Sequence, residues 1–171
     1  MSRVFFLSDL HFHHKNILHF SGPLRDGDTV LEHDHILVTR WNSTVRKRDI
    51  VYVLGDVIMS HDMAILEELH GQKILCRGNH DQYPLQEYLK YFTDVRGIFK
   101  YKGFWCSHAP IHPAELRGCH NIHGHVHGNS IRDAYGDRDK RYINVCCEVN
   151  LGNPIPFEDI RDGTYWSYAR C

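Results

Sequence analysis

A run of apolar residues that ends in glycine and aspartate most constrains how this chain can fold. Residues 50–54 are Ile-Val-Tyr-Val-Leu, and Gly55 and Asp56 follow directly. A continuous β-branched and aromatic run is typical of a strand covered on both faces, as in a parallel sheet flanked by helices. Binding sites in such sheets lie beyond the carboxyl ends of the strands, so we expect Asp56 at a functional edge. A strand that simply ends in a Gly-Asp turn is the alternative.

Two further apolar runs also end in polar residues. Residues 4–7 precede Asp9 and His11, and residues 73–77 precede Asn79. In an extended segment residues i and i+2 point to the same side, so Asp9 and His11 can reach one ion together. Three runs of this kind predict a shared edge of polar side chains.

Helical patterns separate these runs. Thr29 begins a capping-box sequence with Glu32, which predicts a helix to about residue 46. Further helices are expected over residues 60–70, closed by Gly71, and from Pro84 to about residue 92. A strand pair within residues 93–105 and a last strand over residues 141–149 complete the prediction. Alternating strands and helices indicate an α/β fold.

Size and composition favour one soluble domain. With 171 residues and 42% hydrophobic residues, the chain suits a single domain over residues 1–171. A formal net charge of −1 provides no basic field for holding duplex nucleic acid. No stretch approaches the ~18 to 20 apolar residues that cross a bilayer. Six cysteines without Cys-x-x-Cys spacing, and no recognisable secretory signal, predict reduced thiols in a cytoplasmic protein.

Histidine is unusually frequent. The chain has 15 histidines, concentrated in residues 11–19 and 108–127. His125 and His127 have i, i+2 spacing and are flanked by glycines. Such clusters indicate metal binding, because imidazole is a common metal ligand. The histidines are interleaved with strand-like sequence, unlike those of a histidine-rich tag or storage tract.

The polar residues fall into five ordered blocks. They are Asp-x-His at 9–11, Gly-Asp at 55–56, Gly-Asn-His-Asp at 78–81, Ser-His at 107–108 and Gly-His-Val-His at 124–127. This order closely resembles the calcineurin-like metallophosphoesterase superfamily, and the resemblance extends from residue 4 to about residue 150. The sequence Ser-Asp-Leu-His-Phe-His-His-Lys-Asn-Ile is similar to a small bacterial and phage-type subgroup of single-domain phosphoesterases. The resemblance implies two packed mixed β-sheets flanked by helices, an αββα sandwich.

The resemblance also implies a dinuclear metal centre. The implied ligands are Asp9, His11 and His127 for the first ion, Asn79, His108 and His125 for the second, and Asp56 for both. A carboxylate can bridge two ions about 3.5–4 Å apart, whereas an imidazole cannot, so Asp56 belongs at the centre. Imidazole, carboxylate and amide ligands suit Mn²⁺, which we expect, with Fe²⁺ or Zn²⁺ as alternatives. A water or hydroxide shared by the ions would attack phosphorus.

Other residues of these blocks are implied to contact the substrate. His80 would stabilise or protonate the leaving oxygen, and Asp81 would orient its ring. His14 and Asn16 match the subgroup and are candidates for lining the pocket, with a solvated loop as the alternative. For His112 and His123, pocket lining, a core position and loop solvation all stay open.

The leading functional hypothesis is a phosphodiesterase or phosphatase. No insertion is long enough for a cap or a nucleic-acid-binding subdomain, so we expect a small phosphoester substrate. A metal-dependent nuclease and a noncatalytic metal-binding interaction module are the alternatives. No membrane partner is expected, and nucleic acid is considered only as a substrate. The sequence does not determine the physiological substrate, the preference for monoesters or diesters, the native metal or the oligomeric state.

Overall fold

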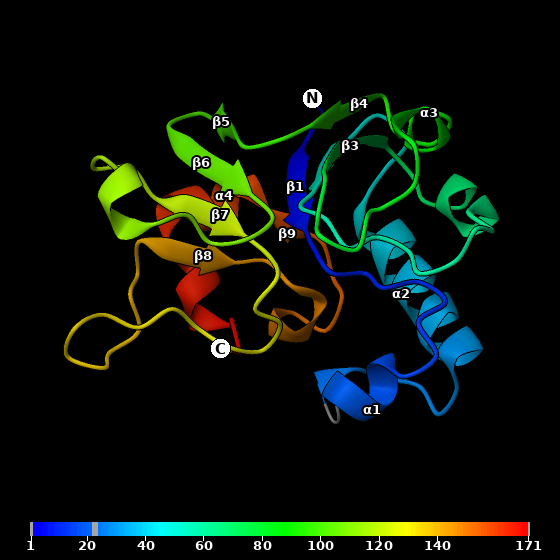
Figure 1. Ribbon diagram of the computed structural model, residues 1–171, viewed down its shortest axis with the longest axis horizontal. Helices are drawn as coiled ribbons and strands as arrows, with labels where there is room; N and C mark the ends of the chain where they lie inside the picture. Colours follow the sequence, from blue (N-terminus) through cyan, green and yellow to red (C-terminus); the bar gives the residue numbers. More distant parts are fainter. Residues whose placement is uncertain (1, 22–23, 171) are drawn as a thin grey trace.

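The apolar run predicted as a buried strand lies in the middle of the larger sheet. In the computed structural model, which describes residues 2–21 and 24–170, β2 (Ile50–Val53) pairs in parallel with β1 (Val4–Leu7) and with β3 (Gln72–Cys76). β4 (Asp94–Arg96) extends the sheet in parallel beyond β3. β9 (Ile155–Pro156) pairs antiparallel with β1 at the other edge. This is a mixed sheet with a parallel centre (Figure 1).

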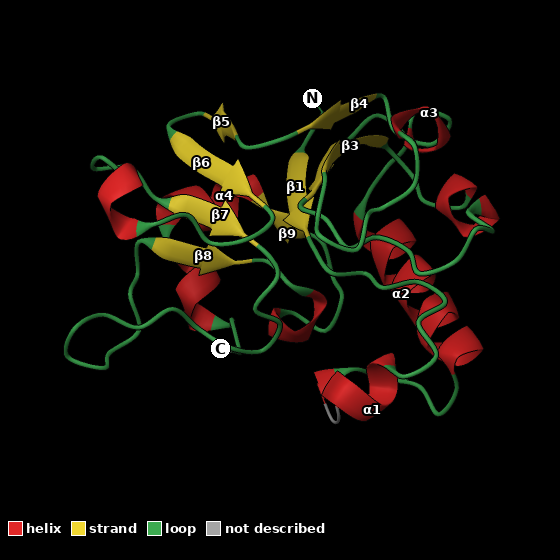
Figure 2. Cartoon of the chain, in the orientation of Figure 1, coloured by secondary structure: helices red, strands yellow, loops and turns green. Residues whose placement is uncertain are grey.

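The second sheet is smaller and also mixed. β5 (Phe99–Tyr101) is antiparallel to β6 (Phe104–Ser107), which is followed in parallel by β7 (Asn121–His123) and β8 (Tyr142–Asn144). Figure 2 shows this sheet beside the larger one, with most helices at the outside. The sheets are joined just beyond β1, where the backbone N–H of Ser8 donates to the carbonyl of Val145. The predicted pair of packed mixed sheets flanked by helices is confirmed.

The central strand is buried on both faces. Val51 and Val53 pack in a core with residues of α2 (Val30–Thr44), whereas Tyr52 and Leu54 pack in a second core with residues of the smaller sheet. Because successive side chains of a strand point to opposite faces, two covered faces require an unbroken apolar run. The sequence of this strand therefore follows from its place between two layers.

The α2 helix begins as predicted. Thr29 is its N-cap, and its side chain accepts a hydrogen bond from the backbone N–H of Glu32 at 3.2 Å. The Glu32 carboxylate accepts from the N–H of Asp28, one residue before the cap, so the capping box is half formed. Trp41 is fully buried on the inner face of this helix.

Two other predicted helices are shorter in the structure. Residues 60–70 contain only the 3₁₀ helix η2 (Ala64–Glu67), because Ser60 and Asp62 use their side chains to bind nearby backbone N–H groups. The helix from Pro84 is α3 (Leu85–Tyr88), and the turn that follows mixes i, i+3 bonds with the i, i+4 bond from Phe92 to Tyr88. Both predictions of a long helix were wrong.

The predicted strand pair within residues 93–105 is divided between the two sheets. β4 joins the larger sheet, and only β5 and β6 form the hairpin, turning at Lys102 and Gly103 with positive φ. The predicted last strand over residues 141–149 ends early, because Cys146 bridges to Ser8 and a 3₁₀ turn follows. Tertiary pairing decides both boundaries.

Several elements have no counterpart in the sequence prediction. They are α1 (Ile17–Ser21), η3 (Pro113–Glu115), η4 (Cys147–Val149), α4 (Phe157–Asp162) and η5 (Thr164–Ser167), together with β9. Phe157 and Ile160 of α4 complete the core between the sheets. None of the helices in the described part of the chain has the length and apolar character needed to cross a bilayer.

Candidate metal centre

The predicted ligands lie in the loops that follow the carboxyl ends of five strands, β1, β2, β3, β6 and β7 (Figure 1). Five of them have the left-handed backbone conformation that residues other than glycine rarely adopt: Asp9, His11, Asp56, His125 and His127, with φ between 51° and 72°. Each such residue costs on the order of 1–3 kcal/mol and tends to occur at functional sites. The loops are therefore held in conformations that turn these side chains toward one point.

The first group consists of Asp9, His11 and His127, whose ligand atoms lie within 4.8 Å of one another. Asp9 Oδ1 is 3.7 Å from His11 Nε2 and 3.9 Å from His127 Nε2. Asp9 Oδ1 and His11 Nε2 are both buried without a hydrogen-bond partner among the described residues. Buried polar atoms are nearly always paired, so these atoms fit a cation between them.

The second group consists of Asp56, His108 and His125, with Asn79 beside them. His108 Nε2 lies 3.4 Å from Asp56 Oδ2, 2.9 Å from Asn79 Oδ1 and 3.1 Å from His125 Nδ1. Burial disfavours the charged imidazole, but the Asp56 and Asp9 carboxylates raise the pKa of His108 to about 9. The electrostatic field at this position thus favours positive charge.

Asp56 lies between the two groups. Its Oδ2 atom is 3.7 Å from His11 Nε2 and 3.4 Å from His108 Nε2, while its Oδ1 atom accepts a hydrogen bond from the N–H of His80 at 2.9 Å. Burial would raise the pKa of Asp56, but the His108 contact lowers it. One carboxylate oxygen is thus near nitrogen ligands from both groups.

The glycines of the motifs allow the loops to approach this closely. A Cβ at Gly78 would lie 2.2 Å from Asp56 Oδ1, and one at Gly124 would lie 1.9 Å from Ser8 Oγ. Any larger residue would push the carboxylate or the Ser8 loop away from the centre.

Asp9 is held in place by contacts to its other oxygen. Asp9 Oδ2 accepts from the N–H of His125 at 2.8 Å and lies 2.6 Å from Ser8 Oγ and 3.2 Å from Cys146 Sγ. Burial by itself would raise the pKa of Asp9, but the contacts with His11, Ser8 and His125 hold it well below its usual range. Asp9 is therefore an ionised carboxylate with one oxygen directed toward His11 and His127.

His127 is oriented by a buried ion pair. Glu148 Oε1 lies 2.9 Å from His127 Nδ1 and accepts a hydrogen bond from Arg25 Nε at 2.7 Å. Arg25 also donates to the carbonyls of Leu10 and Asp9, on the loop of the first group. Burial would raise the pKa of Glu148, but His127 and Arg25 lower it to about 2. The ionised carboxylate selects the His127 tautomer whose Nε2 lone pair faces Asp9.

Comparison with known proteins agrees with this arrangement. The sequence profile of the calcineurin-like phosphoesterase family matches residues 2–166. The chain belongs to the calcineurin-like phosphoesterases.

Two similar proteins and one solved structure span nearly the whole chain. An uncharacterized protein of Methanocaldococcus jannaschii is 32% identical over an alignment of 167 positions that covers 92% of this chain and 89% of that protein. The gene 66 protein of Mycobacterium phage D29 is 26% identical, over 95% of this chain and 96% of its own. The crystal structure of a protein of unknown function from Aquifex aeolicus superposes with a TM-score of 0.73 at 28% identity, covering 95% and 99% of the two chains.

Within the Gly-Asn-His-Asp block, His80 and Asp81 occupy different environments. His80 is exposed, and its ring centroid is 5.7 Å from that of His11. The carboxylate of Asp81 is buried and accepts hydrogen bonds from the N–H groups of Asp56, Val57 and Gly78 at 2.7 to 3.0 Å. These bonds tie the loops after β2 and β3 together, and a role of Asp81 in orienting the His80 ring stays a prediction.

His14 and Asn16, the two candidates for lining the pocket, lie in different places. His14 lies in the pocket beside His11, and its Nδ1 atom is buried without a hydrogen-bond partner among the described residues. Burial, with the neighbouring His11 and His80, lowers the pKa of His14. Asn16 is exposed outside this pocket, and its carbonyl accepts from the N–H of Phe20. Asn16 thus lies just before α1 and accepts a hydrogen bond from its first turn.

His112 and His123, whose roles the sequence left open, lie outside both groups. His112 is the N-cap of η3 and accepts from the N–H of Ala114. His123 is fully buried, and burial lowers its pKa to about 4 despite the contact of its Nδ1 atom with the carbonyl of Gly124. His123 is a core histidine in the phosphoesterase fold.

The sequence analysis missed Arg25 and Glu148. They are 123 positions apart and belong to none of the five blocks. Glu148 has one sequence feature, a charged residue between the apolar residues Cys147 and Val149, whereas no sequence feature marks Arg25. An ionisable residue in a buried segment needs a partner, which is the feature that could have identified Glu148.

Proposed function

We propose that this chain is a metal-dependent phosphoesterase whose single domain holds two divalent ions and hydrolyses small phosphoesters. The main support is the position of Asp56 Oδ2, within 3.7 Å of a nitrogen ligand from each group. The proposed ligands are Asp9, His11 and His127 for the first ion, Asn79, His108 and His125 for the second, and Asp56 for both. Their imidazole, carboxylate and amide donors suit Mn²⁺, with Fe²⁺ or Zn²⁺ as alternatives.

The chain's own residues have distinct roles in this proposal. When bound, the ions supply positive charge for the phosphoryl oxygens and lower the pKa of the attacking water. His80, which lines the pocket beside His11, holds a proton for the leaving oxygen. His14 contacts the substrate next to it. Asp81 has an indirect role, because it holds the Asp56 and Gly78 loops at their mutual distance.

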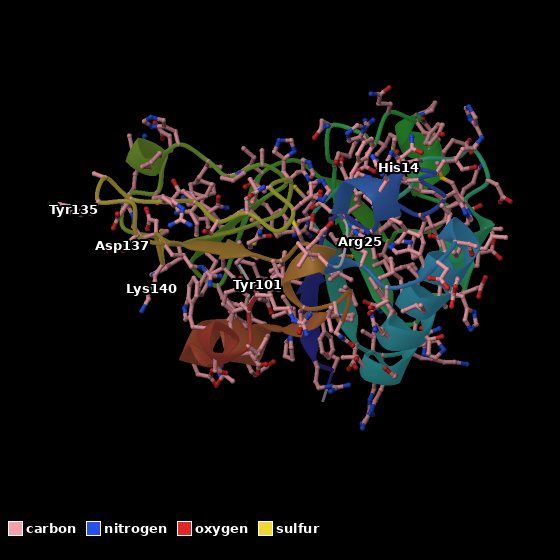
Figure 3. The ribbon with its side chains drawn as sticks, turned by 90° about the horizontal axis from the view of Figure 1, so that it is seen from below. His14, Arg25, Tyr101, Tyr135, Asp137 and Lys140 are labelled. Atoms are coloured by element: carbon pink, nitrogen blue, oxygen red, sulfur yellow. The ribbon has the colours of Figure 1, made fainter. Side chains whose placement is uncertain are left out.

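A substrate panel on the Mn²⁺-loaded protein tests this function. We expect hydrolysis of p-nitrophenyl phosphate, bis-p-nitrophenyl phosphate or 2′,3′-cyclic AMP, and loss of that activity with a chelator and in Asp56→Asn. Asp137→Asn is the matched control, because this exposed carboxylate lies on a loop at the far end of the molecule (Figure 3). Two bound ions without turnover of any substrate would support a noncatalytic module, and exonuclease products from duplex DNA would support the nuclease.

A further inference from the structure

One side of the metal centre opens into a pocket of about 470 Å³. Its inner wall is formed by His11, His80 and His127. Its outer wall is largely apolar, with Ile17, Phe20 and Leu24 contributed by α1 and the segment after it. The pocket therefore begins where the phosphoryl group would bind and extends toward an apolar surface.

A series of rings leads from the metal centre to the mouth of this pocket. The ring centroids of His127 and His11 are 5.3 Å apart, those of His11 and His14 are 5.5 Å apart, and those of His14 and Phe20 are 5.9 Å apart. Phe20 is 70% exposed, although it is a large aromatic residue on a helix of only five residues. Flat groups pack on such rings with favourable offset or edge contacts.

The pocket offers no positive side chain to a second anionic group. Its described lining contains neither lysine nor arginine. The nearby Arg25 is buried behind the wall and is already hydrogen-bonded to Glu148 and to the carbonyl of Leu10. Glu148 also lines the pocket, but its carboxylate is buried and already paired with Arg25 and His127, so it adds no positive group either. The lining favours an uncharged ligand.

Resting on the phosphoesterase function proposed above, we propose that this pocket binds an uncharged ring carried by one ester group of the substrate. The substrate class is then phosphoesters of aromatic or nucleoside-like alcohols, in preference to esters of small alkyl or acidic alcohols. Phe20 is the specificity-determining residue, because its exposed ring lies beside the His14 ring, tilted to it by 40°, at the point where the substituent enters.

Equilibrium binding of phosphonate monoesters tests the pocket without requiring turnover. Calorimetric titrations of the Mn²⁺-loaded protein would compare methyl methylphosphonate, methyl phenylphosphonate, methyl carboxymethylphosphonate and the methylphosphonate ester of thymidine. We expect the phenyl compound to bind about tenfold or more tightly than the methyl compound, as is typical of a filled apolar pocket. The carboxymethyl compound should show no such gain. Tight binding of the thymidine ester as well would identify nucleosides as the source of the ring.

Variants test whether Phe20 causes this preference for a ring. Phe20→Ala should reduce the phenyl-to-methyl affinity ratio by about two- to tenfold, the usual worth of one aromatic contact. Since Phe20 is exposed, its loss should not change the melting temperature, and the variant should still bind both ions. Ile98→Ala is the matched control: this residue is 63% exposed and lines a separate pocket beyond His108. Tyr135→Ala, at the distant end of the molecule, is a second control (Figure 3).

The results separate this inference from the phosphoesterase proposal. Equal binding of the phenyl and methyl compounds to the wild type would overturn the inference, even if the enzyme hydrolyses diesters. An unchanged affinity ratio in Phe20→Ala, or a loss in Ile98→Ala instead, would also overturn it. A ring preference that depends on Phe20, in a protein that hydrolyses none of the test esters, would support the pocket and contradict the proposed activity.

Discussion

The two ligand groups of the metal centre are built differently. In the first, Asp9 and His11 are buried, and His127 is oriented from behind by Glu148 and Arg25. In the second, His125 and Asn79 are exposed, and the ligand atoms lie against one another at 2.9 to 3.4 Å. Buried ligands held by outer hydrogen bonds are preorganised, whereas exposed ligands depend on the ion for their order. We therefore expect the first ion to bind more tightly than the second.

The largest effect is expected at Asp56, which is proposed to bind both ions. Asp56→Asn should lower kcat by at least about 10² to 10³-fold, since a neutral amide binds and bridges divalent ions less well than a carboxylate, and the positive charge of the ions is what stabilises the phosphoryl oxygens. Elemental analysis after dialysis should find fewer than two Mn²⁺ ions per chain. A mutant with two ions and full activity would contradict the bridging position.

The next largest effect is a loss of turnover in a variant that still binds both ions. His80→Ala should lower turnover about 10² to 10⁴-fold and retain both ions, since His80 lines the pocket and contacts Asp56 only through its backbone N–H. The loss should be larger for an alkyl leaving group than for an aryl one, because the more basic alkoxide needs the proton. Metal analysis and rates for both ester types check this prediction. An equal loss for both types would exclude proton donation, and loss of metal would make His80 structural.

The comparison between the two groups is tested most directly at Glu148. Glu148→Gln should weaken binding of the first ion about 10- to 100-fold, since it removes the carboxylate that orients His127. The affinity for the second ion should change by less than about threefold. Calorimetric titration with Mn²⁺ measures the two affinities as two separate binding steps. Equal weakening of both steps would mean that Glu148 acts on the fold rather than on one site.

The smallest effect is a change of stability away from the metal centre. Asp49 is buried and accepts hydrogen bonds from the N–H groups of Arg3 and Arg46 and from the Arg3 guanidinium. Burial would raise the pKa of Asp49, but these bonds lower it below its usual value of 3.8. Asp49→Asn should therefore reduce the free energy of unfolding by about 1–3 kcal/mol at pH 7.

The pH dependence of that loss follows from the sign of the shift. A carboxyl with a lowered pKa in the folded state contributes stability that is present above pH 3.8 and is lost as the pH falls through the lower folded value. The difference between wild type and Asp49→Asn should thus shrink below about pH 4. Denaturant unfolding at pH 7 and pH 3 measures it, and both Mn²⁺ affinities serve as the control, because they should not change.

Local sequence was sufficient to predict β1, β2 and β3 and the polar blocks that follow them. The apolar runs of β1, β2 and β3 and the polar residues after them are adjacent in the chain, so their order follows from the alternation of strands and loops alone. The same holds for the start of α2, where Thr29 and Glu32 are three residues apart. The apolar periodicity of residues 60–70 wrongly predicted a full helix. Periodicity takes no account of side chains, such as that of Asp62, that bind nearby backbone N–H groups.

Only the tertiary structure decided how the ligand loops are supported. Glu148 meets His127 and Arg25 across 21 and 123 positions, and Asp81 binds the N–H of Asp56 across 25. The apolar wall of the pocket likewise depends on where α1 packs beside β1's loop, which no periodic pattern of five residues can specify. A sequence determines residue types and local geometry, whereas the pairing of buried charges and the walls of a pocket depend on which distant segments fold together.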